Sequence, residues 1–221
     1  MTPERLSRVD TVLARRQPDL TVLLEKVYKP HNFSAILRSC DAVGIPRVYA
    51  VPHDWGIPEI GHITSGAHKW LEVEEHENAG SAIRQLKQDG FQVVAAHLSD
   101  RAVDFREVDY CRPTAVVMGT EKTGVTAETL ANIDTEIIIP MLGMTPSLNV
   151  SVACAVILYE AQRQRQQAGL YRKCRLAPAE HARLRFEWLH PVLTDYCRRH
   201  KLAYPTLDEN GDLAEPFPPK K

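Results

Sequence analysis

Short apolar runs typical of strands alternate with helical patterns along most of the chain, and this alternation constrains the fold more than any other feature. From Leu20 onward the strand-like runs are TVLLEKV, RVYAVP, FQVVAAHL, TAVVMG and EIIIP, and segments with apolar residues at helical spacing separate them. Strands joined by helices in this way form a parallel sheet with helices on its faces. We therefore predict an α/β fold with a mostly parallel sheet.

The two ends of the chain depart from this pattern. Thr2-Pro3-Glu4 is typical of a helix start, and this first helix is expected to end near Gln17-Pro18. After Gly169 a charged and aromatic helical pattern runs from Pro178 to about Lys201, with a break at Pro191. With 221 residues and 44% hydrophobic composition, one domain with extensions is expected. The predicted organisation is an N-terminal helical extension (1–17), a central domain (18–168) and a C-terminal helical extension with a frayed tail (169–221).

The net charge of −1 conceals a segregation of charge along the chain. Residues 1–38 carry seven basic and four acidic side chains, and residues 160–201 carry ten and four. Residues 39–159 carry eight basic and sixteen acidic side chains, and the last twenty residues carry two and four. Basic ends on an acidic body indicate a polyanionic partner.

Cysteine and histidine spacing argues against disulfide and metal chemistry. The five cysteines are widely spaced with no C-x-x-C pair, and the nine histidines include no H-E-x-x-H motif. No run approaches the roughly 18 apolar residues of a membrane helix, and the N-terminus lacks the apolar centre of a signal peptide. We expect a cytoplasmic protein without a metal.

Two segments place polar side chains beside predicted strand ends or helix starts. In HNFSAILRSCDAVG, residues 31–44, Asn32 is predicted as a helix N-cap, and Arg38 is either a solvated arginine or one directed at an anion. In VVMGTEKTG, residues 116–124, an apolar strand leads into Gly119, and Glu121 lies in the loop that follows. Loops at the carboxyl ends of parallel strands bind ligands in open α/β sheets, although a plain polar turn fits this segment equally well.

A third segment, Thr135–Gln166, combines a strand, a tight loop and a helix start. The strand breaks at Pro140, the chain loops through Gly143, and a helix is expected from Ser147-Leu148-Asn149. A helix N-terminus presents backbone N–H groups to a ligand, which favours a nucleotide-like cofactor. A stiff turn capped by Ser147 is the alternative interpretation.

Taken in order, the three segments resemble the motifs of the SpoU branch of the SPOUT superfamily, a group of RNA ribose 2′-O-methyltransferases. The matching stretches are NFSAILR (32–38), VMGTEKTG (117–124) and IPMLGMTPSLNVSVA (139–153). The resemblance covers residues 18–168, and the short basic helical ends are similar to those of TrmH-type enzymes, which methylate guanosine 18 in the tRNA D-loop. It implies the SPOUT fold, in which the C-terminal segment of the parallel sheet forms a deep trefoil knot, here residues 135–166. We expect no separate N-terminal RNA-binding domain.

The resemblance also implies a cofactor, partners and site residues. S-adenosylmethionine is the expected cofactor, tRNA the expected substrate, and a homodimer with sites at its interface the expected assembly. The implied cofactor-binding residues are Ala96, Gly119, Ile139, Met141 and Leu148. The implied catalytic residues are Asn32, Arg38, Glu121, Ser147 and Asn149. Because arginine stays protonated in proteins, we expect Arg38 to anchor a phosphate and stabilise an alkoxide and not to act as the base.

The basic ends supply the candidate RNA contacts. These are Arg8, Arg15, Arg16, His31, Arg163, Arg165, Arg172 and Arg175. A solvated helix face is the alternative explanation for such charge. Three alternative functions remain open at this stage: the same reaction on a ribosomal RNA guanosine, the same reaction on the tRNA wobble ribose, and RNA binding without catalysis.

Overall fold

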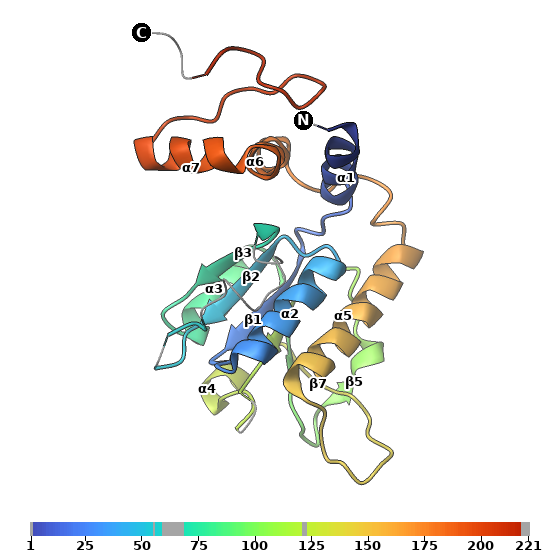
Figure 1. The fold of residues 1–221 in the computed structure, drawn as a ribbon. Helices are drawn as coiled ribbons and strands as arrows, with labels where there is room; N and C mark the ends of the chain where they lie inside the picture. Colours follow the sequence, from blue (N-terminus) through green and yellow to red (C-terminus); the bar gives the residue numbers. More distant parts are fainter. Residues whose placement is uncertain (1, 55, 59–68, 121–122, 218–221) are drawn as a thin grey trace. The chain divides into compact units, whose positions relative to one another are not determined.

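The protein, a computed structural model, is described over residues 2–54, 56–58, 69–120 and 123–217 (Figure 1). Its chain divides into two compact units. One comprises Gln17–Leu170, and the other comprises Met1–Arg16 together with Tyr171–Lys221.

The larger unit contains a parallel sheet of seven strands among the described residues, in the order β3-β2-β1-β6-β4-β7-β5. Every pair of neighbouring strands runs parallel, which confirms the predicted fold class. The two edge strands, β3 and β5, were not predicted, because EVEE is charged and β5 is only two residues long. The strands are β1 (Leu20–Glu25), β2 (Arg47–Val51), β3 (Glu72–Glu75), β4 (Gln92–Ala96), β5 (Val103–Asp104), β6 (Thr114–Met118) and β7 (Thr135–Ile138).

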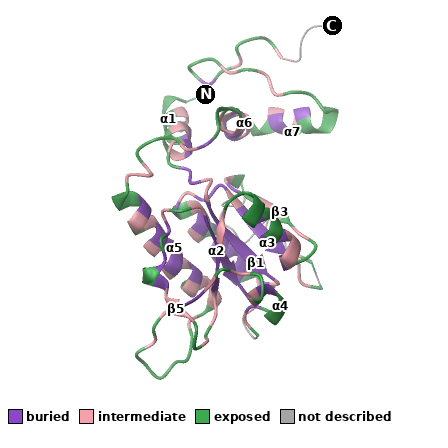
Figure 2. Cartoon of the chain, turned by 180° about the vertical axis from the view of Figure 1, so that it is seen from behind, coloured by how far each residue is buried: buried purple, intermediate pink, exposed green. Residues whose placement is uncertain are grey.

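Helices cover both faces of this sheet (Figures 1 and 2). Helices α2 (Pro30–Ala42) and α5 (Val150–Gln167) pack together on one face. Helices α3 (Ala79–Gln88) and α4 (Ala127–Leu130) lie on the other. The result is the three-layer arrangement that buried parallel strands require.

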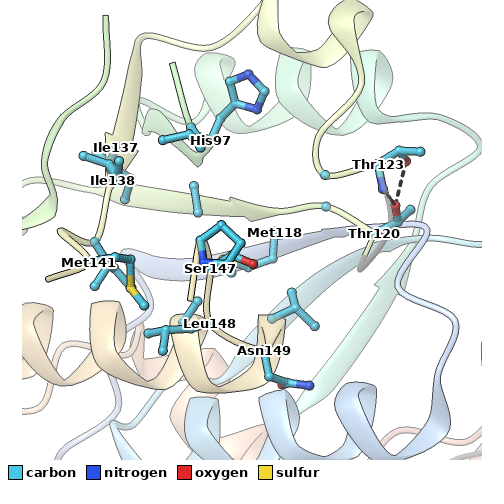
Figure 3. Close-up of a pocket in the computed structure, with 18 of the residues that line it drawn as sticks. His97, Met118, Thr120, Thr123, Ile137, Ile138, Met141, Ser147, Leu148 and Asn149 are labelled. Carbon is cyan, nitrogen blue, oxygen red and sulfur yellow. Dashed lines mark hydrogen bonds between the residues drawn. The ribbon is translucent and has the colours of Figure 1, made fainter. Parts of the chain in front are cut away.

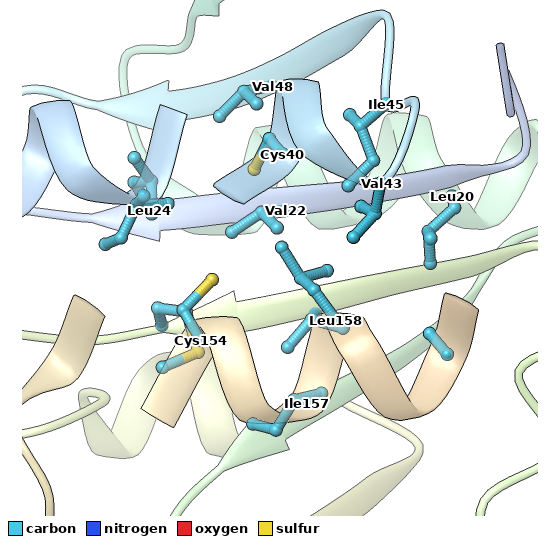
Figure 4. Close-up of a cluster of buried hydrophobic side chains, with 14 of the residues drawn as sticks. Leu20, Val22, Leu24, Cys40, Val43, Ile45, Val48, Cys154, Ile157 and Leu158 are labelled. Carbon is cyan, nitrogen blue, oxygen red and sulfur yellow. The ribbon is translucent and has the colours of Figure 1, made fainter. Parts of the chain in front are cut away.

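The side chains of β1 alternate between two hydrophobic clusters, one on each face. Leu20, Val22 and Leu24 join the cluster beneath α2 and α5, where Leu158 is also fully buried (Figure 4). Leu23 points to the opposite face and joins the cluster that contains the apolar side of α3. This alternation follows from the two-residue period of a strand, and it explains why β1 is apolar almost throughout.

The smaller unit brings the two ends of the chain together. It contains α1 (Pro3–Leu13), α6 (Pro178–Leu189) and α7 (Pro191–His200), and Pro191 separates the last two as predicted. The Arg5 guanidinium donates to the backbone oxygen of Trp188 at 2.8 Å, and Arg185 forms an ion pair with Asp10 at 2.8 Å.

Helix α1 ends at Leu13, four residues before the end expected at Gln17. The amide of Arg15 turns back to the oxygen of Val12, so the last turn tightens into three-residue hydrogen bonding. Pro18 also disfavours a helical conformation at the residue before it.

Arg165, near the end of α5, is fully buried and forms five hydrogen bonds within the larger unit. Its guanidinium donates to the Asp19 carboxylate at 2.7 Å and to the Asp19 backbone oxygen at 2.9 Å. It also donates to the Gln17 side chain at 3.1 Å and to the backbone oxygens of Tyr110 at 2.8 Å and Arg112 at 3.1 Å. One side chain therefore ties α5 to the segments that lead into β1 and β6.

Replacing this arginine tests how much the tie contributes. Arg165→Ala leaves the Asp19 carboxylate and four backbone or amide oxygens without their donor, so the free energy of unfolding is expected to fall by about 3–5 kcal/mol. Chemical denaturation followed by circular dichroism measures this loss.

Arg163→Ala is the matched control, two residues earlier on the same helix. The Arg163 side chain is exposed and pairs with Glu160 one turn away, so its loss is expected to change stability little. Equal losses for the two variants would contradict the structural role of Arg165.

Candidate functional site

A cavity of about 590 Å³ lies at the carboxyl ends of β4, β6 and β7 and at the start of α5 (Figure 3). Open α/β sheets bind ligands at this edge, because the loops that leave the strands do not cover it. Its size falls in the range of small-molecule sites, roughly 300–1,000 Å³. Its lining is formed by Lys29, Ala96, His97, Leu98, Met118, Gly119, Thr120, Thr123, Gly124, Ile137, Ile138, Ile139, Met141, Pro146, Ser147, Leu148, Asn149, Val150 and Ala153.

The structure brings together residues that are far apart in the sequence. The five implied cofactor-binding residues, Ala96, Gly119, Ile139, Met141 and Leu148, all line this cavity. Ser147 and Asn149 of the implied catalytic group line it as well. His31, Asn32 and Arg38 are not in the lining, and Glu121 lies outside the described residues.

Several lining residues were not singled out from the sequence. His97 and Leu98 directly follow β4, and Thr120 and Thr123 follow β6. Their positions just beyond predicted strands were the available signal. Lys29 carries no comparable signal, because it is one of many basic residues in a charged part of the chain.

A hydrogen bond between two asparagines joins the first and third motifs. The Nδ2 of Asn149 donates to the Oδ1 of Asn32 at 3.1 Å. Asn32 is only 1% exposed, so its amide group is held in place by the surrounding core. The Oδ1 of Asn149 accepts from the backbone N–H and the hydroxyl of Ser151, at 2.9 and 2.7 Å. The starts of α2 and α5 are therefore fixed against each other beside the cavity.

Two predicted helix starts need correction. Helix α2 begins at Pro30 with Lys29 in the capping position, so Asn32 lies within the first turn and is not the N-cap. Proline is favoured at the first helical position because its fixed φ suits a helix and its missing N–H needs no partner there. Helix α5 begins at Val150, two residues later than expected, and Asn149 caps it.

The described residues of the second motif form two limbs, residues 119–120 and 123–124, which pair antiparallel and which we call the hairpin. The N–H of Thr120 donates to the oxygen of Gly124 and the N–H of Gly124 donates to the oxygen of Thr120, both at 3.0 Å. The Thr120 and Thr123 hydroxyls are 2.7 Å apart. A Cβ at Gly119 would lie 2.1 Å from the carbonyl carbon of Gly124, so the two limbs can approach this closely only with glycine at that position.

The loop after β4 is held by a carboxylate from β7. Glu136, 7% exposed, accepts hydrogen bonds from the Ser99 hydroxyl and the Arg101 guanidinium. The hydrogen bond from Ser99, followed by the positive charge of Arg101, lowers the pKa of Glu136. These contacts stabilise the loop that places His97 and Leu98 at the cavity.

The candidate RNA-contacting residues fall into two groups. Arg8, Arg15, His31, Arg163 and Arg172 are exposed, and Arg175 is half-buried. Arg163 pairs with Glu160 through two hydrogen bonds of 2.8 and 2.7 Å, which raise the pKa of its guanidinium.

Arg16 and Arg165 are corrected, because both side chains are fully buried. The Arg16 guanidinium lies over the Trp188 ring, 5.0 Å from its centre, and Arg165 has the five hydrogen bonds described above. A position in a basic helical run does not reveal which arginines face inward. Neither residue presents its charge to a phosphate in this structure.

No helix among the described residues is long and apolar enough to cross a membrane. No group of three or more histidine, cysteine or acidic side chains in the same residues could hold a metal ion.

Two protein-family models match the sequence of this chain. The model of the SpoU rRNA Methylase family matches residues 19–159, and the model described as SpoU, rRNA methylase, C-terminal matches residues 163–216. The chain belongs to the SpoU rRNA methylase family. All three motifs of the candidate site lie within the first match.

Individual members of the SpoU family are similar over most of the chain. The tRNA (guanosine(18)-2′-O)-methyltransferase of Escherichia coli K12 is 52% identical over 215 residues, which covers 96% of this chain and 94% of the relative. The crystal structure of the Aquifex aeolicus TrmH/SpoU tRNA modifying enzyme superposes with a TM-score of 0.78 at 42% identity, covering 90% of this chain and 98% of that one.

A further structure of the family contains the cofactor. An AdoMet-bound rRNA methyltransferase from Sinorhizobium meliloti superposes with a TM-score of 0.61 at 31% identity. The match covers 68% of this chain and 58% of that chain.

Adding one methyl group at Gly119 tests the hairpin. Gly119→Ala places a Cβ inside the opposite limb, so the hairpin must open and hydrogen exchange at the Gly124 amide is expected to become faster. Hydrogen-exchange mass spectrometry of the free protein measures this change.

Gly143→Ala is the matched control in the neighbouring loop, where an added Cβ meets nothing within 4 Å. It is expected to leave exchange in residues 119–126 unchanged. If hydrogen exchange at the Gly124 amide were unaltered in the Gly119→Ala variant, the hairpin would have room for the added methyl group. That result would contradict the close packing of Gly119 against Gly124.

Proposed function

We propose that this protein transfers a methyl group from S-adenosylmethionine to the ribose 2′-hydroxyl of guanosine 18 in the D-loop of tRNA. The observation that carries the proposal is that the second and third motifs line one cavity, while Asn32 of the first motif is hydrogen-bonded to Asn149 in that lining. Relatives that match nearly the whole chain, such as the one from Escherichia coli, are named for this reaction. A ribosomal RNA target or the tRNA wobble ribose is less well supported, because relatives that cover 96% and 85% of the chain carry the guanosine 18 name, whereas a relative named for 23S rRNA covers 72%.

The residues of the cavity suit S-adenosylmethionine. Ile139 and Leu148 offer apolar surface for an adenine ring, and Gly119 and Gly124 have no side chain that would keep a ligand away from the backbone. We assign cofactor binding to Ala96, Gly119, Ile139, Met141 and Leu148. When bound, S-adenosylmethionine supplies a methyl group that is electrophilic because it is attached to a positively charged sulfur.

Residues of the chain must orient the ribose and assist the removal of the proton from its 2′-hydroxyl. We assign this to Asn32, Arg38, Ser147 and Asn149, together with Glu121, which lies outside the described residues. The hydrogen bond between Asn149 and Asn32 fixes the amide groups beside the cavity, so that Ser147 is positioned two residues before the N-cap of α5. Fixed polar groups stabilise developing charge without having to reorganise.

Arg38 is suited to bind an anion. Its side chain is exposed, and it forms no hydrogen bond or ion pair with any other described residue. None of its five N–H donors is used by a described residue, which suits the guanidinium to a phosphate of the RNA or to the oxygen that loses its proton. Because a guanidinium stays protonated, Arg38 anchors and stabilises and does not accept the proton.

A homodimer accounts for the position of Arg38 outside the cavity lining. Four large apolar side chains are exposed on the loop before α5 and on α5 itself: Leu142, Met144, Val152 and Tyr159. Such a group favours association with another protein surface. In a symmetric dimer, Arg38 of one subunit would act at the cavity of the other.

Three further assignments follow from this function. The segment 135–166 is proposed to form the trefoil knot of the SPOUT fold. The extensions 1–17 and 169–221 are proposed to flank a methyltransferase domain of residues 18–168. The proposed contacts with tRNA phosphates are Arg8, Arg15, Arg172 and Arg175 on the extensions and His31 and Arg163 on the domain. A tRNA substrate also favours a cytoplasmic location.

Removing the Arg38 guanidinium is expected to separate cofactor binding from catalysis. Arg38→Ala should bind S-adenosylmethionine about as well as the wild type in calorimetry, because the side chain is not part of the cavity lining. Methyl transfer to tRNA should fall by at least about a hundredfold, since one charge-stabilising donor typically contributes that much. The exposed Arg84 of α3 gives the control variant, Arg84→Ala, which is expected to retain full activity.

Mixed dimers show whether Arg38 acts across the interface. If it does, an equal mixture of Arg38→Ala and Asn149→Ala subunits yields heterodimers with one intact site, and about a quarter of wild-type activity returns. No recovery would assign both residues to the same subunit, and turnover by Arg38→Ala alone would contradict its catalytic role.

A further inference from the structure

Glu25, the last residue of β1, is a buried carboxylate that none of the assignments above uses. It is 3% exposed and forms no ion pair with any described residue. Burying a charge without a partner of opposite charge is costly, so a site that does so must offer several hydrogen-bond donors.

Three donors surround this carboxylate, and all of them come from the segment that follows the second motif. The N–H of Thr126 donates to Oε2 at 3.0 Å, and the Thr126 hydroxyl donates to Oε1 at 2.7 Å. The hydroxyl of Thr129 donates to Oε1, also at 2.7 Å. An ionised carboxylate suits this arrangement because it accepts at both oxygens and donates nothing.

These contacts fix the point at which the chain returns from the hairpin to the core. Leu24 pairs with Met118, so Glu25 lies one residue beyond that pair, level with the start of the hairpin. On the returning limb, Val125 is buried in the cluster beneath α3, and Thr126 caps α4. The hairpin thus has one limb continuous with β6 and the other attached to β1 through Glu25.

The described residues of the hairpin form one wall of the cavity. Gly119, Thr120, Thr123 and Gly124 all line it, whereas Glu25 does not. A shift of the returning limb would move this wall without disturbing the strands beneath it. Glu25 can therefore affect the cavity only through the hairpin.

We propose that Glu25 is a positioning residue, which holds the returning limb of the hairpin, residues 123–124, in the place where it binds S-adenosylmethionine. This rests on the proposed function for the identity of the ligand, although the anchoring of the hairpin stands on the hydrogen bonds alone. A purely structural role would make Glu25 matter for stability and leave cofactor affinity unchanged.

Glu25→Gln is the first test. Glutamine has the same shape, but its NH₂ group replaces one of the two carboxylate oxygens and cannot accept the hydrogen bond that this oxygen receives. Hydrogen exchange at the Thr126 and Gly124 amides of the free protein is expected to become faster. The KM for S-adenosylmethionine is expected to rise about tenfold, a change comparable to the loss of one hydrogen bond to a charged group, while kcat at saturation falls less.

Two matched variants separate positioning from general destabilisation. Val48→Ala removes two methyl groups at the amino end of β2, far from the hairpin, and should lower the melting temperature without changing that KM. Thr126→Ser keeps both donors and should behave as wild type, whereas Thr126→Val loses the hydroxyl and should resemble Glu25→Gln.

Hydrogen exchange tests the role of Glu25, and binding of S-adenosylmethionine tests the proposed function, so the failure of one can be distinguished from the failure of the other. If the wild type binds no S-adenosylmethionine in calorimetry, the proposed function fails, and hydrogen exchange still decides whether Glu25 anchors the hairpin. Unchanged exchange in Glu25→Gln would overturn the anchor. An unchanged KM, or an equal rise in Val48→Ala, would overturn the positioning role.

Discussion

The buried guanidinium of Arg165 is the interaction on which the geometry of the larger unit depends. Its five hydrogen bonds attach the end of α5 to the residues that precede β1 and β6, the two central strands that pair along their length. Asn149 lies sixteen residues earlier on the same helix, about 24 Å away at 1.5 Å per residue. A tie at one end of a rigid helix therefore helps to determine where the other end meets the cavity.

The buried polar side chains of this unit are hydrogen-bonded to segments that are distant in the sequence. Arg165 uses all of its donors, Glu25 receives three, and Asn32 is engaged by Asn149. Each connects segments that are far apart in the sequence, as backbone hydrogen bonds between parallel strands also do. Apolar contacts bring α2, α5 and β1 together, but they are not directional. The buried polar contacts add direction, and they lie where the motifs must be aligned.

The sequence predicts the parts of the fold that local patterns determine. β1, β4 and β6 are apolar runs bounded by turn residues, and Pro191 divides two helices as its chemistry requires. The edge strands β3 and β5 escaped prediction because an edge strand has only one neighbour and needs no apolar run. The end of α1 and the starts of α2 and α5 were misplaced by two to four residues, since proline and capping side chains compete there.

The candidate site was only partly accessible from sequence. The five cofactor-binding residues were assigned from the family resemblance, because nothing in the local pattern of Ala96 or Ile139 distinguishes them from other strand residues. The inward direction of Arg16 and Arg165 could not be read from a basic helical run, because long side chains reach either core or solvent from similar positions. The role inferred for Glu25 depends on contacts across about a hundred residues of sequence.

The most direct test of the account is methyl transfer to two tRNA transcripts that differ by one oxygen. The protein is incubated with labelled S-adenosylmethionine and either an unmodified transcript or one with a 2′-deoxyribose at guanosine 18. We predict that label enters the first transcript and not the second. Equal labelling of both would place the reaction elsewhere on the RNA, and labelling of neither would contradict the proposed activity.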